Sequence, residues 1–181
     1  MRRLILLRHG KAEIVGLTGG DRERPLAARG RAESAMTAQW LSVAGFSPDL
    51  VYMSPSMRTR STWECASAVF TEARTEVVEA LYLAGLDTLL EVLEDAPEVE
   101  TIMVVGHNPG LQELGLHLAI EGGASPDLAD RIAQGFPTAS AYVFRMGEMR
   151  GEGVEAVFEP PGRAGGEPRW AFFGGRAGEA D

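Results

Sequence analysis

Arg8-His9-Gly10 is the group of residues best suited to chemistry in this chain. It follows the apolar run 4–7, which is typical of a buried parallel strand. In an open α/β sheet, ligands bind at the carboxyl ends of the strands. An imidazole beside a guanidinium there predicts chemistry on a phosphoryl group. A neutral His9 with one ring nitrogen bonded to a backbone carbonyl can attack phosphorus with the other nitrogen; the alternative is a structural histidine at a strand end.

A second histidine is expected at the same edge. His107 follows the apolar run 102–106, and Asn108-Pro109 predicts a helix that Asn108 caps and Pro109 opens. A helix N-terminus presents free N–H groups and a partial positive charge, which favour an anion. If the strands are parallel, His107 and His9 flank one pocket for a dianion. A capping or packing role for His107 is the alternative.

Arg58 supplies a third element of the predicted pocket, because it comes just after the predicted strand 50–54. A guanidinium grips phosphoryl oxygens through two parallel hydrogen bonds, which lysine cannot do. Arg60 is expected on a solvated surface, since it faces elsewhere on a helix. Ser54 and Ser56 are expected to cap a helix that Pro55 opens, and no Gly-x-Ser-x-Gly elbow marks either as a nucleophile.

Strands and helices alternate along the sequence. The predicted strands are 4–7, 50–54, 76–78, 102–105, 141–146, 154–158 and 170–173, and the helices are 28–44, 55–70, 86–93, 109–120 and a further one from 125 to 135. This order predicts a three-layer α/β/α fold with a mostly parallel central sheet. The spacing of Ala32, Met36, Trp40 and Val43 predicts the core-facing side of the first long helix. Residues 1–181 are expected to form a single domain, with 151–181 a loop-rich hairpin and a frayed end.

Composition excludes several classes of function. The 181 residues carry a net charge of −9, which argues against nucleic-acid binding and makes a local cationic cluster more informative. No segment approaches the roughly 20 apolar residues of a membrane span. Cys65 is the only cysteine, which agrees with a cytoplasmic location. Cys65 is expected to have a structural role, and so is His117, which lies in the middle of a predicted helix. The absence of phosphate-loop, dinucleotide and zinc spacings predicts no metal and no cofactor.

Three motifs, each after a predicted strand, together resemble the histidine phosphatase superfamily, which has the phosphoglycerate-mutase-like fold. They are Arg8-His9-Gly10, Ser54-x-x-x-Arg58-Thr59-x-x-Thr62 and Gly106-His107-Asn108-Pro109. The short chain and Arg24-Pro25-Leu26 resemble its compact SixA-type phosphohistidine phosphatase branch. The resemblance covers residues 2–146.

The resemblance implies a metal-independent phosphatase that works through a phosphohistidine enzyme intermediate. His9 would be the nucleophile, while Arg8, Arg58 and His107 would hold the phosphoryl oxygens, and water would then release the phosphate. Gly10 and Asn108 would join the substrate-binding residues.

The proton donor is the open part of this interpretation. Asp21 and Glu79 are the candidates, and a surface role for either is the alternative. A weak donor suits a phosphoramidate, since the imidazole of a phosphohistidine can carry its own proton. We therefore expect a phosphorylated substrate, namely a protein that carries a phosphohistidine. Two alternatives stay open: a phosphomonoesterase for small phosphorylated metabolites, and a non-catalytic phosphoryl-binding module.

Overall fold

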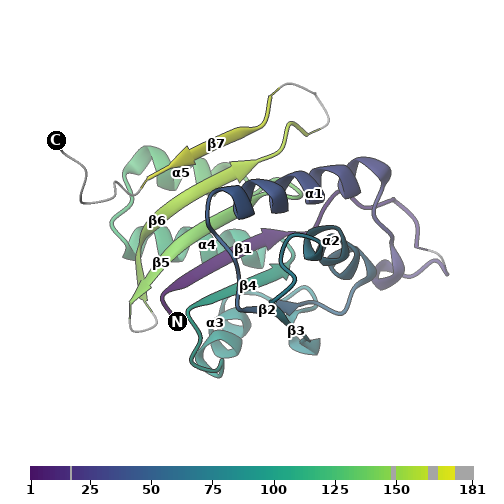
Figure 1. Ribbon diagram of the computed structural model, residues 1–181, viewed down its shortest axis with the longest axis horizontal. Coiled ribbons are helices and arrows are strands. Elements are labelled where there is room, and N and C mark those ends of the chain that lie inside the picture. Colours follow the sequence, from purple (N-terminus) through teal and green to yellow (C-terminus); the bar gives the residue numbers. More distant parts are fainter. Residues whose placement is uncertain (17, 148–149, 163–166, 174–181) are drawn as a thin grey trace.

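A computed structural model describes residues 1–181 except 17, 148–149, 163–166 and 174–181 (Figure 1). Its strands are β1 (Arg3–Arg8), β2 (Leu50–Met53), β3 (Arg74–Val77), β4 (Thr101–Gly106), β5 (Ala141–Gly147), β6 (Arg150–Glu159) and β7 (Arg169–Phe172). Its α-helices are α1 (Ala28–Val43), α2 (Met57–Ser67), α3 (Leu86–Glu94), α4 (Gly110–Glu121) and α5 (Pro126–Gln134). Two short 3₁₀ helices, η1 (Asp21–Glu23) and η2 (Glu79–Leu81), lie in loops.

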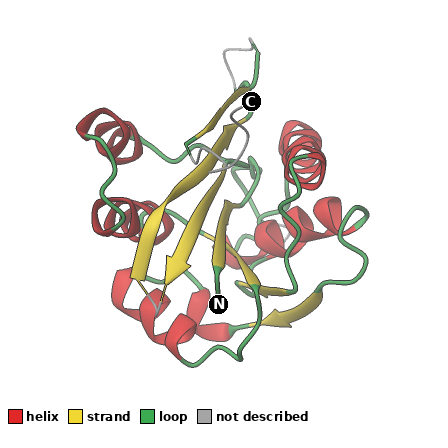
Figure 2. Ribbon diagram, turned by 60° about the vertical axis from the view of Figure 1, so that its left-hand side comes forward, coloured by secondary structure: helices red, strands yellow, loops and turns green. Residues whose placement is uncertain are grey.

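The described strands form one seven-stranded sheet in the order β3-β2-β4-β1-β5-β6-β7. β3, β2, β4 and β1 are mutually parallel, whereas β5 and β7 run against the other strands. Helices cover both faces of the sheet (Figure 2). The predicted three-layer fold with a mostly parallel sheet is therefore confirmed.

The register of the parallel strands brings their carboxyl ends to one edge. Arg8 pairs with Gly106, and Met53 pairs with Val105. The segments that follow β1, β2 and β4 consequently begin side by side. This edge is where the sequence places its two candidate histidines and Arg58.

The hydrophobic core lies on both faces of the sheet, and the side chains of β1 alternate between them. Ile5 and Leu7 pack toward α1 and α2, and Leu4 and Leu6 pack toward α3, α4 and α5. All four side chains are fully buried. Each such burial stabilises the fold by about 1.5–3 kcal/mol, so the strand that precedes the candidate site is rigidly held.

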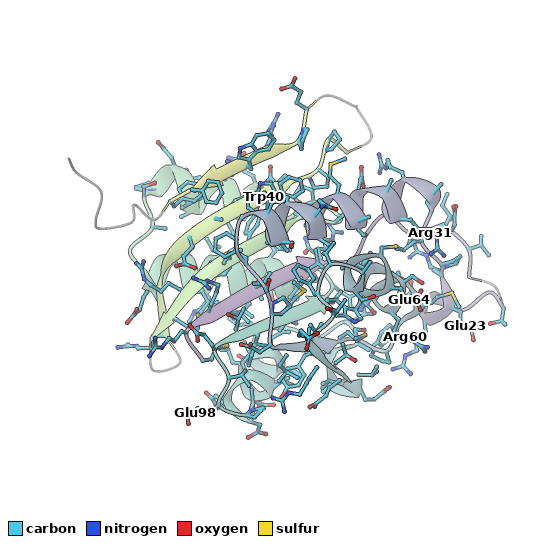
Figure 3. All side chains as sticks on the ribbon, viewed as in Figure 1. Glu23, Arg31, Trp40, Arg60, Glu64 and Glu98 are labelled. Atoms are coloured by element: carbon cyan, nitrogen blue, oxygen red, sulfur yellow. The ribbon has the colours of Figure 1, made fainter. Side chains whose placement is uncertain are left out.

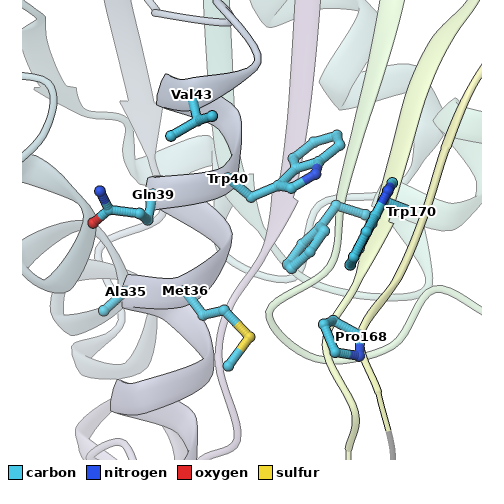
Figure 4. A pocket seen from close by; sticks show the side chains of 8 residues that line it. Ala35, Met36, Gln39, Trp40, Val43, Pro168 and Trp170 are labelled. Atoms are coloured by element: carbon cyan, nitrogen blue, oxygen red, sulfur yellow. The ribbon is translucent and has the colours of Figure 1, made fainter.

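The predicted core side of α1 is wrong. Met36 and Val43 are 40% and 81% exposed, and Trp40 is only half-buried, where it stacks on Phe158 at 4.8 Å between ring centroids. These residues border a groove beside Trp170 (Figure 4). The buried side of α1 instead carries a partly polar set of residues: Gly30, Glu33, Ser34, Thr37, Ala38 and Leu41. Helix α1 packs closely on the loop after β1 at Gly30 and Ser34, which lie against Gly10 and Lys11, so large side chains would not fit at these two positions.

Two helix starts also differ from the prediction. Helix α2 begins at Met57, and its N-cap is Ser56, whose hydroxyl accepts a hydrogen bond from the Thr59 N–H. Helix α4 begins at Gly110 with Pro109 at the N-cap, so the Asn108 side chain is not the cap. The physical reason is that other contacts occupy both predicted caps: the Ser54 hydroxyl bonds to His107, and the Asn108 side chain donates to Gln112 and to the Phe136 carbonyl.

The end of the chain adds antiparallel strands to the sheet. β6 pairs with β5 on one side and with β7 on the other. The predicted fraying of residues 174–181 lies outside the described residues. Within the described part of the chain, no helix is long and apolar enough to cross a membrane. The single-domain organisation and the cytoplasmic location stay predictions.

Candidate active site

Gly10 lies in the loop directly after β1. Its N–H donates to the Thr62 hydroxyl at 2.9 Å, which ties the loop to α2. A Cβ at this position would lie 2.6 Å from both the Gly30 carbonyl oxygen and the Ser34 hydroxyl. Only glycine fits between these neighbours. Gly10 is buried and does not line the cavity described below, so its part in the site is to allow this close approach.

His9 is held as a neutral imidazole. Its Nδ1 lies 2.7 Å from the Gly10 carbonyl oxygen, which can only accept, so Nδ1 carries the proton and Nε2 keeps its lone pair. Burial lowers the pKa of His9 to about 3, and the positive charges of Arg58 and Arg8 act in the same direction. A neutral histidine with a free ring nitrogen can act as a nucleophile near neutral pH.

His107 stands beside His9 at the end of β4. The two ring centroids are 5.2 Å apart. The Nε2 atom of His107 shares a hydrogen bond of 2.7 Å with the Ser54 hydroxyl, while Nδ1 is buried with no partner among the described residues. Burial, and then the charge of Arg58, lowers the pKa of His107 to about 4. Ser54 therefore orients this ring, a role that sequence reasoning missed when it assigned Ser54 to a helix cap.

Arg58 is a buried cation held by one residue. It lies in the first turn of α2 with 3% of its surface exposed. Nη1 donates to the Asp21 backbone carbonyl at 2.7 Å, and Nη2 donates to Asp21 Oδ2 at 3.0 Å. The Thr62 hydroxyl donates to the Arg58 carbonyl and accepts from Gly10, so it couples Arg58 to the loop that carries His9.

Arg8 reaches the site from the end of β1. Its Nη1 donates to the Phe136 carbonyl, and its Nε is buried with no partner in the described structure. The Asn108 side chain donates to the same Phe136 carbonyl at 3.2 Å. The Phe136 ring is fully buried and packs edge-on against Tyr142 at 4.2 Å. A carbonyl on a fixed segment thus orients two candidate site residues, and no local sequence pattern marks it.

Asp21 lies in the site as a carboxylate. It accepts hydrogen bonds from Tyr82 at 2.7 Å, Arg24 at 3.0 Å and Arg58. The bond from Tyr82 is the largest cause that holds the pKa of Asp21 well below its usual range. An ionised Asp21 cannot donate a proton near neutral pH, so the geometry favours a role in holding Arg58.

Glu79 lies apart from these residues. Its carboxylate pairs with Arg22, and its side chain is 72% exposed. Arg22 also stacks over the Tyr82 ring, 4.4 Å from its centroid. Glu79 therefore supports the outer side of the loop that contains Asp21, and it does not line the cavity.

Six of the eight candidate residues, all except Gly10 and Glu79, converge on one cavity of about 330 Å³. Its lining comprises Arg8, His9, Lys11, Ala12, Asp21, Arg24, Arg58, Leu83, His107, Asn108 and Thr138. The hollow of about 520 Å³ beside α1 is lined without any ionisable side chain. The chemistry of this chain is therefore expected at the sheet edge, where imidazoles and guanidinium groups surround a space that fits an anion.

A phosphoglycerate-mutase-like fold with two histidines and two arginines at the strand ends defines a class of phosphoryl-handling proteins, and comparisons identify the family. Residues 4–82 match the model of the histidine phosphatase superfamily, branch 1. An uncharacterised chloroplastic protein of Arabidopsis thaliana is 33% identical over 173 residues, covering 88% of this chain and 78% of that protein. The chain belongs to the histidine phosphatase superfamily.

Solved structures link the chain to the SixA-type branch. The candidate phosphohistidine phosphatase SixA of Agrobacterium tumefaciens superposes with a TM-score of 0.70 at 29% identity, covering 80% of this chain and 92% of that one. The corresponding protein of Nakamurella multipartitia gives a TM-score of 0.74 at 26% identity, with coverages of 86% and 94%. The resemblance drawn from the three motifs is thereby confirmed.

Proposed function

We propose that this protein is a metal-independent phosphatase that forms a phosphohistidine intermediate on His9. The observation that carries the proposal is a neutral His9, with Nε2 free, in one cavity with Arg8, Arg58 and His107. The two guanidinium groups supply the positive charge that a phosphoryl dianion requires.

The reaction has two steps. In the first, His9 Nε2 forms a bond to phosphorus while the bond from phosphorus to the leaving atom breaks. In the second, water attacks phosphorus, the N–P bond breaks, and His9 regains its lone pair. Arg8, Arg58 and His107 hold the oxygens as charge develops, and loss of one preorganised donor of this kind typically costs about 10² to 10³ in rate.

The lack of a suitably placed proton donor among Asp21 and Glu79 favours a phosphohistidine as substrate. Asp21 is held ionised, and Glu79 lies outside the cavity, so neither candidate acid is placed to protonate a leaving group. The imidazole of a phosphohistidine can leave with a proton of its own, whereas the alkoxide of a sugar phosphate requires a donor. The similarity to SixA structures supports the same choice of substrate, a phosphohistidine-bearing protein.

The test compares kcat/KM on a phosphohistidine peptide with kcat/KM on a panel of sugar and nucleotide monophosphates. We expect the peptide to be preferred, His9→Ala to abolish turnover, and the wild type to acquire acid-labile, base-stable phosphate on His9. His117→Ala is the matched control, because His117 lies on the surface of α4 beside Glu121. Full turnover by His9→Ala would exclude the mechanism, and a preference for sugar phosphates would exclude the substrate.

A further inference from the structure

Lys11 is the only lysine of the chain, and it lines the cavity two residues after His9. Histidines aside, all other basic side chains are arginines. The Lys11 carbonyl accepts from the Ala27 N–H at 2.8 Å, and a Cβ on Gly30 would come within 2.6 Å of the Lys11 nitrogen. The backbone of Lys11 is thus clamped against the start of α1, while its side chain is exposed.

The cavity holds more positive charge than one phosphoryl group needs. Four cations line it, and Asp21 is the carboxylate among the lining residues. Asp21 pairs with Arg24 and Arg58, whereas the side chain of Lys11 makes no ion pair or hydrogen bond within the described part of the chain. Because both lining histidines are neutral near pH 7, the lining carries a net charge of about +3 by formal counting, and a dianion balances two of these charges.

We propose that Lys11 binds a second anionic group, a carboxylate or a second phosphate, that lies beside the phosphoryl group on the substrate. The inference rests on the proposed function and adds a feature of the substrate to it. A chain with net charge −9 repels anionic ligands at long range, so an unmatched cation at the cavity matters for their capture.

The type of residue fits this role. Lysine carries a compact charge on a flexible four-carbon stem, whereas arginine presents a rigid fork. The phosphoryl oxygens require the fixed forks of Arg8 and Arg58, while a second anion at a variable distance is better matched by an ammonium group. A merely solvated Lys11 would make binding insensitive to a second charge, which gives the experiment a clear alternative.

The experiment measures binding of phosphonates to the full chain by calorimetry. Methylphosphonate has one anionic group, phosphonoacetate and 3-phosphonopropionate add a carboxylate at two distances, and methylenediphosphonate adds a second phosphonate. We expect the best two-anion ligand to bind the wild type about 3- to 10-fold more tightly than methylphosphonate, as for a partly exposed charge pair, and less so at high salt. The two kinds of second anion show which chemistry is accepted.

Matched variants assign the effect. Lys11→Gln should remove the preference, Lys11→Glu should reverse it, and Lys11→Arg should retain it. Arg60→Gln is the control, because it removes the same charge from α2 outside the cavity (Figure 3). An equal preference in Lys11→Gln and Arg60→Gln, or no preference in the wild type, would overturn the inference. Turnover of a phosphohistidine peptide is measured in parallel, so absence of turnover would refute the proposed function while the binding ratios still decide the role of Lys11.

Discussion

Lowering the pH to about 5 should destabilise this protein through its two active-site histidines. The pKa of His9 lies at about 3 and that of His107 at about 4, both below the ordinary value of 6.5, with burial as the largest cause. As the pH falls below 6.5, the unfolded chain binds protons at these positions and the folded chain does not. Above pH 6.5 the two histidines therefore do not lower the free energy of unfolding. As the pH falls below 6.5, they lower it progressively.

The magnitude depends little on the precise pKa of either residue. Each imidazole that stays neutral in the folded state lowers the free energy of unfolding by about 1.36 kcal/mol per pH unit below 6.5. Between pH 6.5 and about pH 5, the loss is about 2 kcal/mol for each histidine. The two residues together account for about 4 kcal/mol, a large part of the roughly 5–15 kcal/mol that stabilises a typical domain. A folded-state pKa higher by one unit would reduce the His107 contribution only slightly.

Urea unfolding near pH 7 and pH 5 measures this effect. Between the two values, we expect His9→Gln and His107→Gln each to lose about 2 kcal/mol less stability than the wild type. An equal loss in His9→Gln and the wild type would show that His9 is not held neutral by burial. The reasoning that makes it a nucleophile would then fail.

Three further outcomes are expected from the contacts of the site. Arg58→Lys should lower kcat by about 10² or more, because an ammonium cannot make the paired bonds to Asp21 and the phosphoryl oxygens, and steady-state kinetics test this. Gly30→Ala should destabilise the fold by about 1–3 kcal/mol in urea unfolding, since its Cβ would lie 2.2 Å from the Lys11 carbonyl oxygen. Tyr82→Phe should raise the pKa of Asp21 as followed by NMR titration, because it removes the largest cause of the lowering; no change would show that Tyr82 does not contact Asp21.

The apolar runs predicted the places where the chemistry lies. Runs buried on both faces must be central strands, and parallel strands end at one edge. The pairing of Arg8 with Gly106 places His9 and His107 next to each other, as the two runs indicated. These inferences needed only local sequence, because a short, continuous apolar segment that is buried on both faces has few possible positions other than the centre of a sheet.

The long loops of the site were not predictable in the same way. Asp21 and Glu79 were equivalent candidates in sequence, since each is an acid after a strand. The folded loops separate them: Asp21 holds Arg58 inside the cavity, and Glu79 pairs with Arg22 outside it. The face of α1 was misjudged for a related reason, because helical spacing identifies an apolar stripe and cannot say which neighbours cover it.

By itself, the sequence determined where the central strands lie, the order in which the motifs follow them and the residue types at the strand ends. These features depend on local hydrophobic patterning and backbone preference. Only the tertiary structure decided which polar groups meet. The hydrogen bond of Ser54 to His107 joins residues 53 positions apart, and that of Arg8 to Phe136 spans 128 positions. Such contacts arise from the packing of whole layers, which places distant segments together without leaving a local pattern in the sequence.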